Sequence, residues 1–465
     1  MSYQLPQHID NNKVFIVNRS EIEGRLDPKM ALYNRKVQNW SYPKVRLKDL
    51  LLSKPQYGAA EPGINRTDIK SPRYIRITDI DEYGLISHND LGATANTIED
   101  QYILHDYDLL IARSGATVGK AYIHKGCPYT CFFAGYLIRF VINPLKAMPD
   151  YVFAFTQTNT YKEWVNAIQR PSGQPNINAE EYQSLEIPLP PQPIQNEIVS
   201  IIQTAYSKKQ RKEFEAQQLL DGIDKYLLDE LGVSLPEVRN ELKDRVFLLN
   251  RSELEGRFDP TVYKDGIKLI SSKWDNEKLS KVAFVNPGGA YKGKTADTPI
   301  SFVPMEVIDE TFSEITTMGE TTIEQASGFT KFREGDLLWA KITPCMQNGK
   351  SAIAKNLTNG LGCGSTEFFV MRSKDEQLAI EYLHVILHMK CVRETAMLYF
   401  GGSAGQQRVS SAFLENFNLP LPPKGKQIEI VNHVCAMRQR AKVLQEEGKA
   451  ILEEAKRNVE SMIIG

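Results

Sequence analysis

Two stretches of the chain carry apolar residues at repeated spacings of three and four. The first runs from Ile194 to Leu231 and is followed by Gly232, and the second runs from Ile428 to Met462. This spacing places the apolar side chains on one stripe of a helix, and the glycine supplies a stop signal. A helix of roughly 38 residues spans about 57 Å at 1.5 Å per residue, which is more than the core of one domain needs. We therefore expect each helix to find a partner outside its own globule.

The most economical partner for each long helix is the other one. Both stripes have near-heptad spacing and charged flanks, such as Lys208 to Lys212 in the first helix and Glu446 to Lys449 in the second. Such helices can pair as a coiled coil. We predict an antiparallel coiled coil that relates the two halves of the chain by a pseudo-twofold axis. The alternative is that each helix packs on its own globule as an ordinary amphipathic helix.

The chain as a whole is a segment that occurs twice, globule and helix together. Phe15 to Pro28, FIVNRSEIEGRLDP, returns as Phe247 to Pro260, FLLNRSELEGRFDP, at a numbering offset of 247 − 15 = 232. Leu185 to Val199 returns as Phe417 to Val431 at the same offset, 417 − 185 = 232. A fixed period of this kind indicates a tandem duplication. Between the repeated segments the apolar positions correspond while the loops diverge, which suits two copies of one scaffold that act on different targets.

Each half divides into a globule and a helix. Short β-branched and aromatic runs, broken by Gly, Pro, Asn and Asp, alternate with one helical stretch at about 151–168, which predicts a mixed α/β globule. The proline-rich segments 187–191 and 419–423 then prevent the chain from continuing as a helix. The expected organisation is a first globule at 1–192, a central helix at 193–232, a second globule at 233–424 and a C-terminal helix at 425–465.

Composition narrows the class of protein. The chain has 56 Lys and Arg against 57 Asp and Glu, so it lacks the overall basic field of a protein that binds nucleic acid alone, and such a role needs local patches or a partner. No apolar run approaches the roughly 18 residues of a membrane span, and the start MSYQLPQHIDNN does not resemble a signal peptide. The six cysteines of so long a chain do not suggest a disulfide framework. We expect a cytoplasmic protein with reduced thiols.

Two diverged globules that alternate with two long helices form a layout that resembles the specificity (S) subunit of a type I restriction-modification system. The resemblance rests on the RLDP and RFDP segments, on LLIARSGATVGKAYI at Leu109–Ile123, and on the loops SGQPNI at Ser172–Ile177 and SAGQQRV at Ser403–Val409. It implies that each globule is a target-recognition domain that reads one half of a bipartite, asymmetric DNA site.

The same resemblance implies a set of partners and cofactors. The helices would set the spacing between the half-sites and dock two adenine methyltransferase (M) subunits, and two restriction (R) subunits would join them on double-stranded DNA. No cofactor is expected in this chain, whereas the partner subunits would use S-adenosylmethionine, ATP and Mg²⁺. A protein with two unlike domains would meet two unlike half-sites at a separation set by its own geometry.

Two kinds of loop in each half are candidate DNA contacts, because they combine glycines with basic or amide side chains that can reach phosphates or base edges. The alternative is that the glycines only provide positive φ in hairpin turns and that the loops support the helices. The hairpin candidates are Arg113, Ser114, Gly115 and Lys120 in the first half and Lys341, Gln347, Asn348 and Lys350 in the second. The candidates in the Gly-Gln loops are Arg170, Gly173, Gln174 and Asn176, and Gly405, Gln406, Gln407 and Arg408.

Histidine and cysteine side chains offer a candidate for metal binding. His384, His388 and Cys391 lie at i, i+4 and i+7 on an expected helix, a spacing that could hold zinc and that leaves a metal hydrolase open. The segment lacks the Glu of the zinc-protease helix and its surroundings are apolar, so we expect core packing and no metal site. Cys131 and Cys363 are related by the offset of the duplication, which suggests equivalent buried positions.

The chain carries none of the sequence patterns of an enzyme that we sought. It has no NPPY-type or DPPY-type tetrapeptide to hold a flipped adenine, no glycine motif for S-adenosylmethionine, no Walker A sequence and no convincing PD-(D/E)xK pattern. We expect a non-catalytic chain whose partners supply the chemistry. Two alternatives stay open: a specificity subunit of a methyltransferase-only or other defence system, and a DNA-binding scaffold or repressor that works without a methyltransferase.

Overall fold

The computed structural model describes residues 14, 16, 28–38, 40–87, 90–169, 175–235, 260–402 and 406–464. The chain divides into two compact units: unit 1 comprises Met1–Arg211 and Glu447–Gly465, and unit 2 comprises Lys212–Glu446. Each unit therefore contains one α/β domain and one half of each long helix. The predicted domain limits, which follow one another along the chain, stay a prediction.

The two long helices form where the apolar spacing predicted them. Helix α6 covers Gln192–Leu231 and helix α12 covers Lys424–Ile464. Helix α6 ends at the expected glycine, because Gly232 has a φ of +60° and a Cβ there would lie 2.7 Å from the side chains of Ser272 and Lys273. No helix that the structure describes combines the length and the apolar content needed to cross a bilayer.

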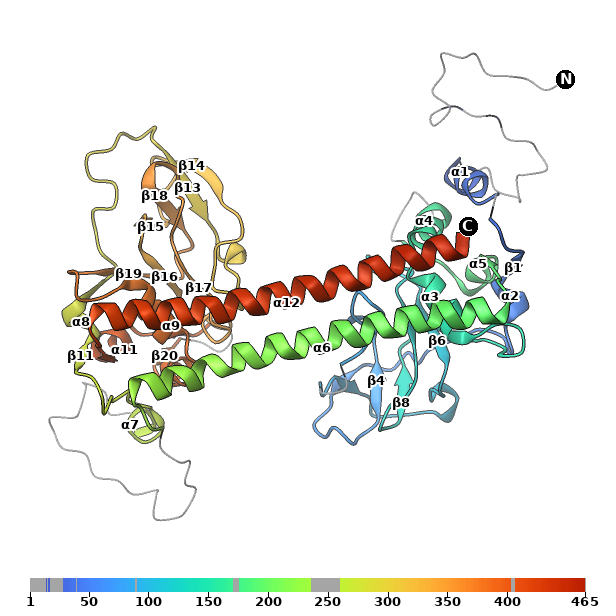
Figure 1. Ribbon diagram of the computed structural model, residues 1–465, viewed down its shortest axis with the longest axis horizontal. Coiled ribbons are helices and arrows are strands. Elements are labelled where there is room, and N and C mark those ends of the chain that lie inside the picture. Colours follow the sequence, from blue (N-terminus) through green and yellow to red (C-terminus); the bar gives the residue numbers. More distant parts are fainter. Residues whose placement is uncertain are drawn as a thin grey trace. The chain divides into compact units, whose positions relative to one another are not determined.

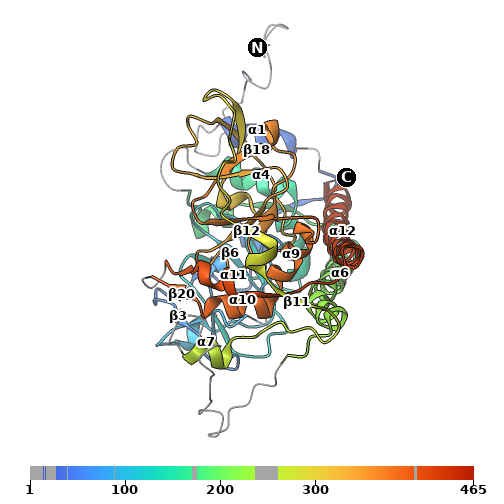
Figure 2. The same ribbon diagram turned by 90° about the vertical axis from the view of Figure 1, so that its left-hand side faces the viewer.

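The two helices lie side by side and run antiparallel in each unit (Figure 1 and Figure 2). In unit 1 a Cβ on Gly448 would lie 3.5 Å from the side chain of Lys209. In unit 2 the ring of Tyr226 stacks on His433 with a centroid distance of 4.2 Å. The partner's number falls as the position along α6 rises, so the predicted antiparallel pairing is confirmed. The pseudo-twofold relation between the two halves stays a prediction.

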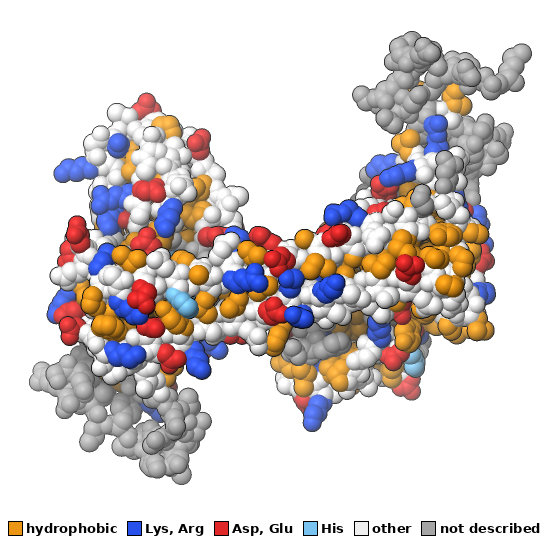
Figure 3. All heavy atoms as spheres, in the orientation of Figure 1, with side chains coloured by type: hydrophobic (Ala, Val, Ile, Leu, Met, Phe, Trp, Pro, Cys, Tyr) orange, Lys and Arg blue, Asp and Glu red, His pale blue; other side chains and the backbone are white. Residues whose placement is uncertain are grey.

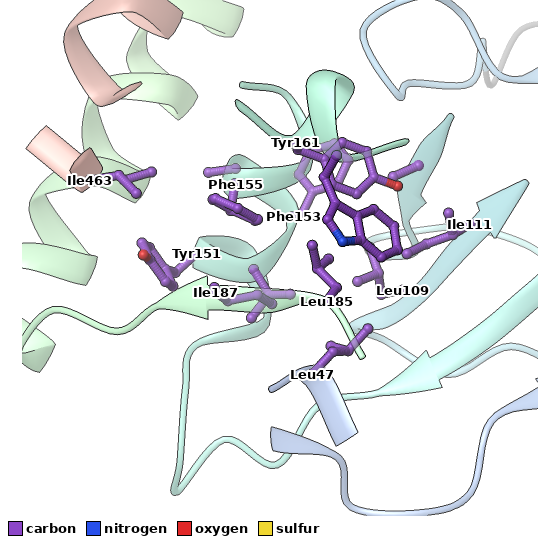
Figure 4. Packing of buried hydrophobic residues seen from close by; sticks show 14 of the residues in the cluster. Leu47, Leu109, Ile111, Tyr151, Phe153, Phe155, Tyr161, Leu185, Ile187 and Ile463 are labelled. Carbon is purple, nitrogen blue, oxygen red and sulfur yellow. The ribbon is translucent and has the colours of Figure 1, made fainter. Parts of the chain in front are cut away.

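Both helices also contribute to the cores of the α/β domains. In unit 1 Ile198 and Ile202 of α6 share a core with Val459 and Ile463 of α12, and Figure 4 shows Ile463 beside Tyr151 of the domain. In unit 2 the same arrangement uses residues from the other half of each helix, namely Ile223, Leu227, Leu231, Ile430 and Val434. Each apolar stripe is therefore wide enough to contact the neighbouring helix and a domain at once.

The α/β domain of unit 1 contains two four-stranded sheets. Its strands are β1 (Lys44–Arg46), β2 (Gln56–Tyr57), β3 (Ile64–Asn65), β4 (Arg73–Ile75), β5 (Ala93–Thr94), β6 (Asp108–Ala112), β7 (Ala121–Ile123), β8 (Cys131–Phe133), β9 (Leu137–Val141) and β10 (Glu186–Pro188). One sheet has the order β2-β9-β6-β7 with antiparallel neighbours. The other has the order β3-β5-β4-β8, in which β4 and β8 are parallel. Its helices are α1 (Pro28–Lys36), α2 (Leu47–Leu50), α3 (Pro149–Thr156), α4 (Asn159–Ile168) and α5 (Ala179–Gln183).

The α/β domain of unit 2 repeats this plan. Its strands are β11 (Asn276–Lys278), β12 (Ala283–Val285), β13 (Pro299–Val303), β14 (Gly319–Thr322), β15 (Thr330–Arg333), β16 (Leu337–Ala340), β17 (Ser351–Ile353), β18 (Leu361–Gly364), β19 (Phe368–Ser373), β20 (Phe400–Gly401), β21 (Arg408–Val409) and β22 (Asn418–Pro420). The sheet β12-β19-β16-β17 is antiparallel, and the sheet β14-β13-β18-β15 contains a parallel β13-β18 pair. Its helices are α7 (Pro260–Asp265), α8 (Leu279–Val282), α9 (Ile380–His388), α10 (Lys390–Met397) and α11 (Ser411–Asn416).

The two domains therefore confirm the predicted tandem mixed α/β architecture. Cys131 lies in β8 and Cys363 in β18, each of them the partner in the parallel strand pair, and both side chains are buried. This confirms that the two cysteines occupy equivalent positions.

The predicted single helix at about 151–168 is wrong in one respect, because it is divided into α3 and α4. Thr158 takes an extended conformation between them, and its hydroxyl oxygen accepts a hydrogen bond of 3.2 Å from the amide of Tyr161. A threonine at this position satisfies one of the free amides that begin a helix. The apolar spacing continues across the break, so the pattern alone did not reveal it.

A buried glutamine ties the start of each long helix to its domain. Gln195 and Gln427 are equivalent positions of the two repeats and have exposed fractions of 3% and 0%. Each amide group bridges the proline-rich segment and the residue that precedes α3 or α9. The bonds join Gln195 Nε2 to Pro190 O (2.8 Å), Met148 N to Gln195 Oε1 (2.9 Å), Gln427 Nε2 to Pro422 O (2.8 Å) and Ala379 N to Gln427 Oε1 (2.8 Å). The duplicated sequence thus repeats a specific hydrogen-bond arrangement as well as a pattern of apolar positions.

Candidate nucleic-acid interface

In unit 1 the hairpin and the Gly-Gln loop that were predicted to contact DNA lie next to each other. The amide of Gly115 donates to the carbonyl of Pro175 over 3.0 Å, and the amide of Ile177 donates to the carbonyl of Arg113 over 2.8 Å. Ser114 and Asn176 form the bridge between the two segments. Two candidate segments that are distant in sequence therefore form one surface.

An aromatic ring lies against the basic residue of this surface, and a second exposed tyrosine follows nearby in the backbone pairing. The guanidinium carbon of Arg113 lies 4.8 Å from the ring centroid of Tyr57, which is a cation–π geometry. The amide of Arg113 donates to the carbonyl of Tyr136, whose own ring is 66% exposed. Asn176 is exposed beside them. Exposed rings next to a cation and an amide are suited to contacts with bases and phosphates.

Unit 2 brings together the equivalent segments. The amide of Thr343 donates to the carbonyl of Gln407 and the amide of Val409 donates to the carbonyl of Lys341, both over 2.9 Å. Ile342 and Arg408 form the bridge, as Ser114 and Asn176 do in unit 1. On its other side β21 pairs with β20, so Arg408 is fixed between two neighbouring segments.

An ion pair distinguishes the surface of unit 2 from that of unit 1. The Nε and Nη2 atoms of Arg408 donate to the two carboxylate oxygens of Glu367 over 2.9 Å and 2.8 Å. These hydrogen bonds lower the pKa of Glu367 below its ordinary value, with a further contribution from the positive charge of Lys341. The amide of Lys341 donates to the carbonyl of Glu367, so the three residues are neighbours.

A basic pocket of about 350 Å³ lies next to this ion pair in unit 2. Lys341 and Lys331 supply its positive charge, and Thr366 and Phe368 on either side of Glu367 contribute to its wall. The lining also contains Asn286, Gly288, Gly289 and Phe329. Glycines without side chains and nearby ammonium groups allow the backbone of a ligand to approach closely.

Two of the predicted lysines have acceptors within their own domains. Lys120 Nζ donates to the carbonyl of Ile80 over 2.6 Å, and Lys350 Nζ donates to the carbonyl of Met305 over 3.2 Å. Each bond joins a hairpin to a turn near the end of β4 or β13. The role of these lysines in DNA binding stays a prediction, while their structural role is visible.

The remaining predicted residues differ in placement. The carbonyl of Gln347 accepts a hydrogen bond from Arg393 of α10, and Asn348 is exposed. Gln406 is exposed and its carbonyl accepts from Nη1 of Arg408 over 3.0 Å. Four of the predicted residues lie outside the described part of the chain, and these are Arg170, Gly173, Gln174 and Gly405.

Sequence reasoning missed Tyr57, Tyr136 and Glu367. Tyr136 and Glu367 directly precede strands β9 and β19, where no basic or glycine-rich pattern marks them. Only the pairing of these strands with β6 and β16 brings the residues to the candidate loops. An alignment of the two repeats could have paired Tyr136 with Glu367, because each residue directly precedes the equivalent buried strand of its repeat, β9 or β19.

The first of the two histidines that could suggest a metal site lies in the core of unit 2. His384 is buried and its Nε2 lies 3.0 Å from the hydroxyl oxygen of Ser351. Burial lowers the pKa of His384 to about 3. Met389 interrupts the expected helix, so Cys391 belongs to α10 and not to α9. Among the described residues no group of three His, Cys, Asp or Glu side chains is placed to hold a metal ion.

Comparisons with known proteins place these two domains in a family. Residues 73–218 and 271–440 match the family described as type I restriction modification DNA specificity domain. The specificity subunit of the Escherichia coli type I restriction enzyme EcoEI is 34% identical over 232 residues, which is 48% of this chain and 36% of that protein. That of EcoAI, also from Escherichia coli, is 30% identical over 194 residues, or 41% of this chain and 32% of that protein. The matches thus span about a third of the length of these relatives.

One solved structure supports the fold, and a second is similar over most of the chain at a lower score. A chain from a structure concerned with complex assembly and conformational transition of the type I R-M system superposes with a TM-score of 0.50 at 15% identity, over 91% of this chain and 96% of that one. The S subunit from Thermoanaerobacter tengcongensis gives a TM-score of 0.36 at 16% identity, over 92% and 96%. With two matching regions that cover most of both α/β domains and the first part of the helix that follows each, the chain belongs to the family of type I restriction modification DNA specificity domains.

Proposed function

We propose that this chain is the DNA sequence-recognition subunit of a type I restriction-modification complex. In this proposal each α/β domain reads one half of a bipartite, asymmetric site. The observation that carries the proposal is the convergence of the same two candidate segments in both units. Residues 113–115 meet 175–177 in unit 1, and 341–343 meet 407–409 in unit 2.

The chemistry of the two surfaces supports an asymmetric site. Unit 1 presents Arg113, Asn176 and exposed aromatic rings, whereas unit 2 presents Arg408, Glu367 and a lysine-lined pocket. Asparagine and arginine form different hydrogen-bond pairs with base edges. One scaffold with unlike side chains at equivalent positions would therefore read two unlike half-sites.

The long helices support a role in spacing. Helices α6 and α12 have 40 and 41 residues, and each is continuous from one unit to the other. At 1.5 Å per residue a helix of this length extends for about 60 Å. We infer that the helix pair sets the unread gap between the two half-sites.

The outward surface of the same helices is the proposed docking site for two M subunits. Figure 3 shows Lys, Arg, Asp and Glu side chains interspersed with apolar ones along their outward side. Phe214 of α6 and Ile428 of α12 are 63% and 47% exposed. Partner subunits would contribute S-adenosylmethionine-dependent methylation of adenine, and R subunits would contribute ATP- and Mg²⁺-dependent restriction. They would also supply positive charge to the complex, because this chain has a net charge of −1.

Mapping methylated adenines across a genome tests the proposal. We expect coexpression of the chain with its methyltransferase subunit to yield one split motif with two different halves. Exchange of residues 15–190 for those of another family member should change one half only. Methylation that does not depend on this chain, or tight DNA binding by the chain without any methylation, would contradict the proposal and favour a scaffold or repressor.

A further inference from the structure

The two repeats place one exposed polar residue at the same structural position. Asn176 and Arg408 are separated by the period of the duplication, 408 − 176 = 232. Each forms a bridge with the neighbouring hairpin segment, and each is followed by a buried apolar residue, Ile177 or Val409. The exposed side chains of residues 176 and 408 therefore lie on equivalent bridged segments but differ in their hydrogen-bonding groups.

The orientation of Arg408 is fixed by its partners. A guanidinium group carries five N–H donors. Two of them are taken by the bidentate pair with Glu367 and a third by the carbonyl of Gln406, so two donors, one on each terminal nitrogen, have no partner among the described residues. The side chain is nevertheless 43% exposed. The carboxylate holds one edge of the planar group, which leaves donors on the terminal nitrogens for a ligand.

We propose that Arg408, oriented by Glu367, reads a guanine in the half-site of unit 2, and that Asn176 reads an adenine at the equivalent place in unit 1. This inference rests on the proposed function and adds the identity of the bases. Two parallel N–H donors match the O6 and N7 acceptors of guanine, and a carboxamide matches N6 and N7 of adenine. Glu367 is a positioning residue in this arrangement.

The charge of the pair favours a base over a phosphate. A carboxylate held beside the guanidinium cancels most of its field and repels a phosphate group. The edge of guanine is uncharged and offers two acceptors, so it does not experience this repulsion. The nearby pocket has Lys331 and Lys341 without a carboxylate among its lining residues, and these ammonium groups are better suited to the DNA backbone.

The position of the pair also suits a reading role. Arg408 lies on β21 between β20 and the segment 341–343, and Glu367 precedes the buried strand β19. Both backbones are therefore fixed by hydrogen bonds to neighbouring strands. A specificity contact needs such support, because a side chain on a fixed strand keeps the geometry that distinguishes one base from another.

Binding selection from random DNA duplexes tests the inference with the full chain in complex with its methyltransferase subunits. The first variant is Arg408→Lys, which keeps the positive charge but loses the paired N–H donors. The second is Glu367→Gln, which keeps the size of the side chain but loses the carboxylate that orients Arg408. Glu324→Gln serves as the control, because it removes an exposed carboxylate of unit 2 outside this cluster.

We expect the wild-type complex to prefer guanine at one position of the unit 2 half-site by about 5- to 150-fold. Arg408→Lys should reduce that preference about tenfold and leave the other half-site unchanged. Glu367→Gln should reduce the preference while raising affinity for unrelated DNA, because it removes a negative charge from the surface. If Glu367 had a purely structural role, Glu367→Gln would lower both the guanine preference and the affinity for unrelated DNA. Glu367→Asp should restore part of the guanine preference.

The other outcomes separate this inference from the proposed function. A split motif whose guanine preference survives both Arg408→Lys and Glu367→Gln would overturn the inference and leave the proposed function standing. Equal weakening on all sequences, with a smaller dependence on salt, would identify Arg408 as a phosphate contact and would also overturn it. Failure of the wild-type complex to enrich any split motif would instead contradict the proposed function.

Discussion

The buried glutamine at the start of each long helix provides a sharp test of the fold. Replacing Gln427 by Met keeps the length of the side chain but removes its polar atoms. The amide of Ala379 then loses its acceptor, and the carbonyls of Pro422 and Gln377 lose a donor, at bonds that now measure 2.7 to 2.8 Å. Gln427 is fully buried and its bonds to Ala379 and Pro422 are buried, so water cannot replace these two bonds.

We expect the free energy of unfolding to fall by about 2–4 kcal/mol. Each buried partner left without a hydrogen bond costs about 1–3 kcal/mol, and the two carbonyls cost less than the amide because each keeps a second lone pair for other contacts. Gln195→Met in unit 1 removes one bond fewer, so its cost should be smaller. Gln217→Met is the matched control, because Gln217 is exposed on α6 and bonds only to the carboxylate of Asp221. Gln217→Met should change the free energy of unfolding by no more than about 0.5 kcal/mol.

Hydrogen exchange measured by mass spectrometry locates the effect without assuming that both units unfold together. A loss of about 3 kcal/mol corresponds to exchange faster by about two orders of magnitude. We expect this acceleration in peptides from the start of α9 and α12 for Gln427→Met, and in peptides from the start of α3 and α6 for Gln195→Met. Unchanged exchange at α9 in Gln427→Met would refute the reasoning.

Three further predictions concern pH, DNA binding and spacing. Burial lowers the pKa of His384 to about 3, so between pH 6.5 and 3 this side chain binds a proton in the unfolded chain but not in the folded one. The free energy of unfolding of unit 2 should therefore fall by about 1.4 kcal/mol per pH unit from this group as the pH falls from 6.5 towards 3. Urea unfolding of His384→Asn should show a shallower loss with pH, and an unchanged slope would contradict the assignment. Arg113→Ala should reduce the slope of the logarithm of the DNA-binding constant against the logarithm of the salt concentration by about one. Binding titrations at several salt concentrations measure this slope, and a slope equal to that of the wild type would exclude a phosphate contact. Insertion of seven residues after both Lys212 and Gln445, each three residues from the contact between Lys209 and Gly448 in the helix pair, adds about 10 Å to both helices. It should lengthen the unread gap by up to about 3 bp in methylation maps. An unchanged gap would reject the spacing role.

The sequence predicted the architecture well because duplication and helical spacing are properties of many residues at once. The constant offset between the repeats matched Cys131 with Cys363, and the stripes of α6 and α12 predicted their antiparallel contact. Such patterns tolerate errors at single positions. The break at Thr158 and the break at Met389 depend on single residues, and the apolar spacing does not record them.

The candidate interface was predictable only in part. The glycine-containing loops could be identified from composition, and the structure brings them together in both units. Tyr57 lies in β2, and Tyr136 and Glu367 directly precede β9 and β19, which are strands whose pairing is not visible in the sequence. Strand register decides which distant side chains meet, so these contacts required three-dimensional information.

The division of each helix between the units has a consequence for biosynthesis. Unit 1 includes Glu447–Gly465, and Leu452, Val459 and Ile463 are buried in its core. The domain that leaves the ribosome first must therefore wait for this last stretch of α12 before its apolar surface is covered. A premature stop codon near position 447 would remove these residues from the core of unit 1, while unit 2 would keep all of its residues.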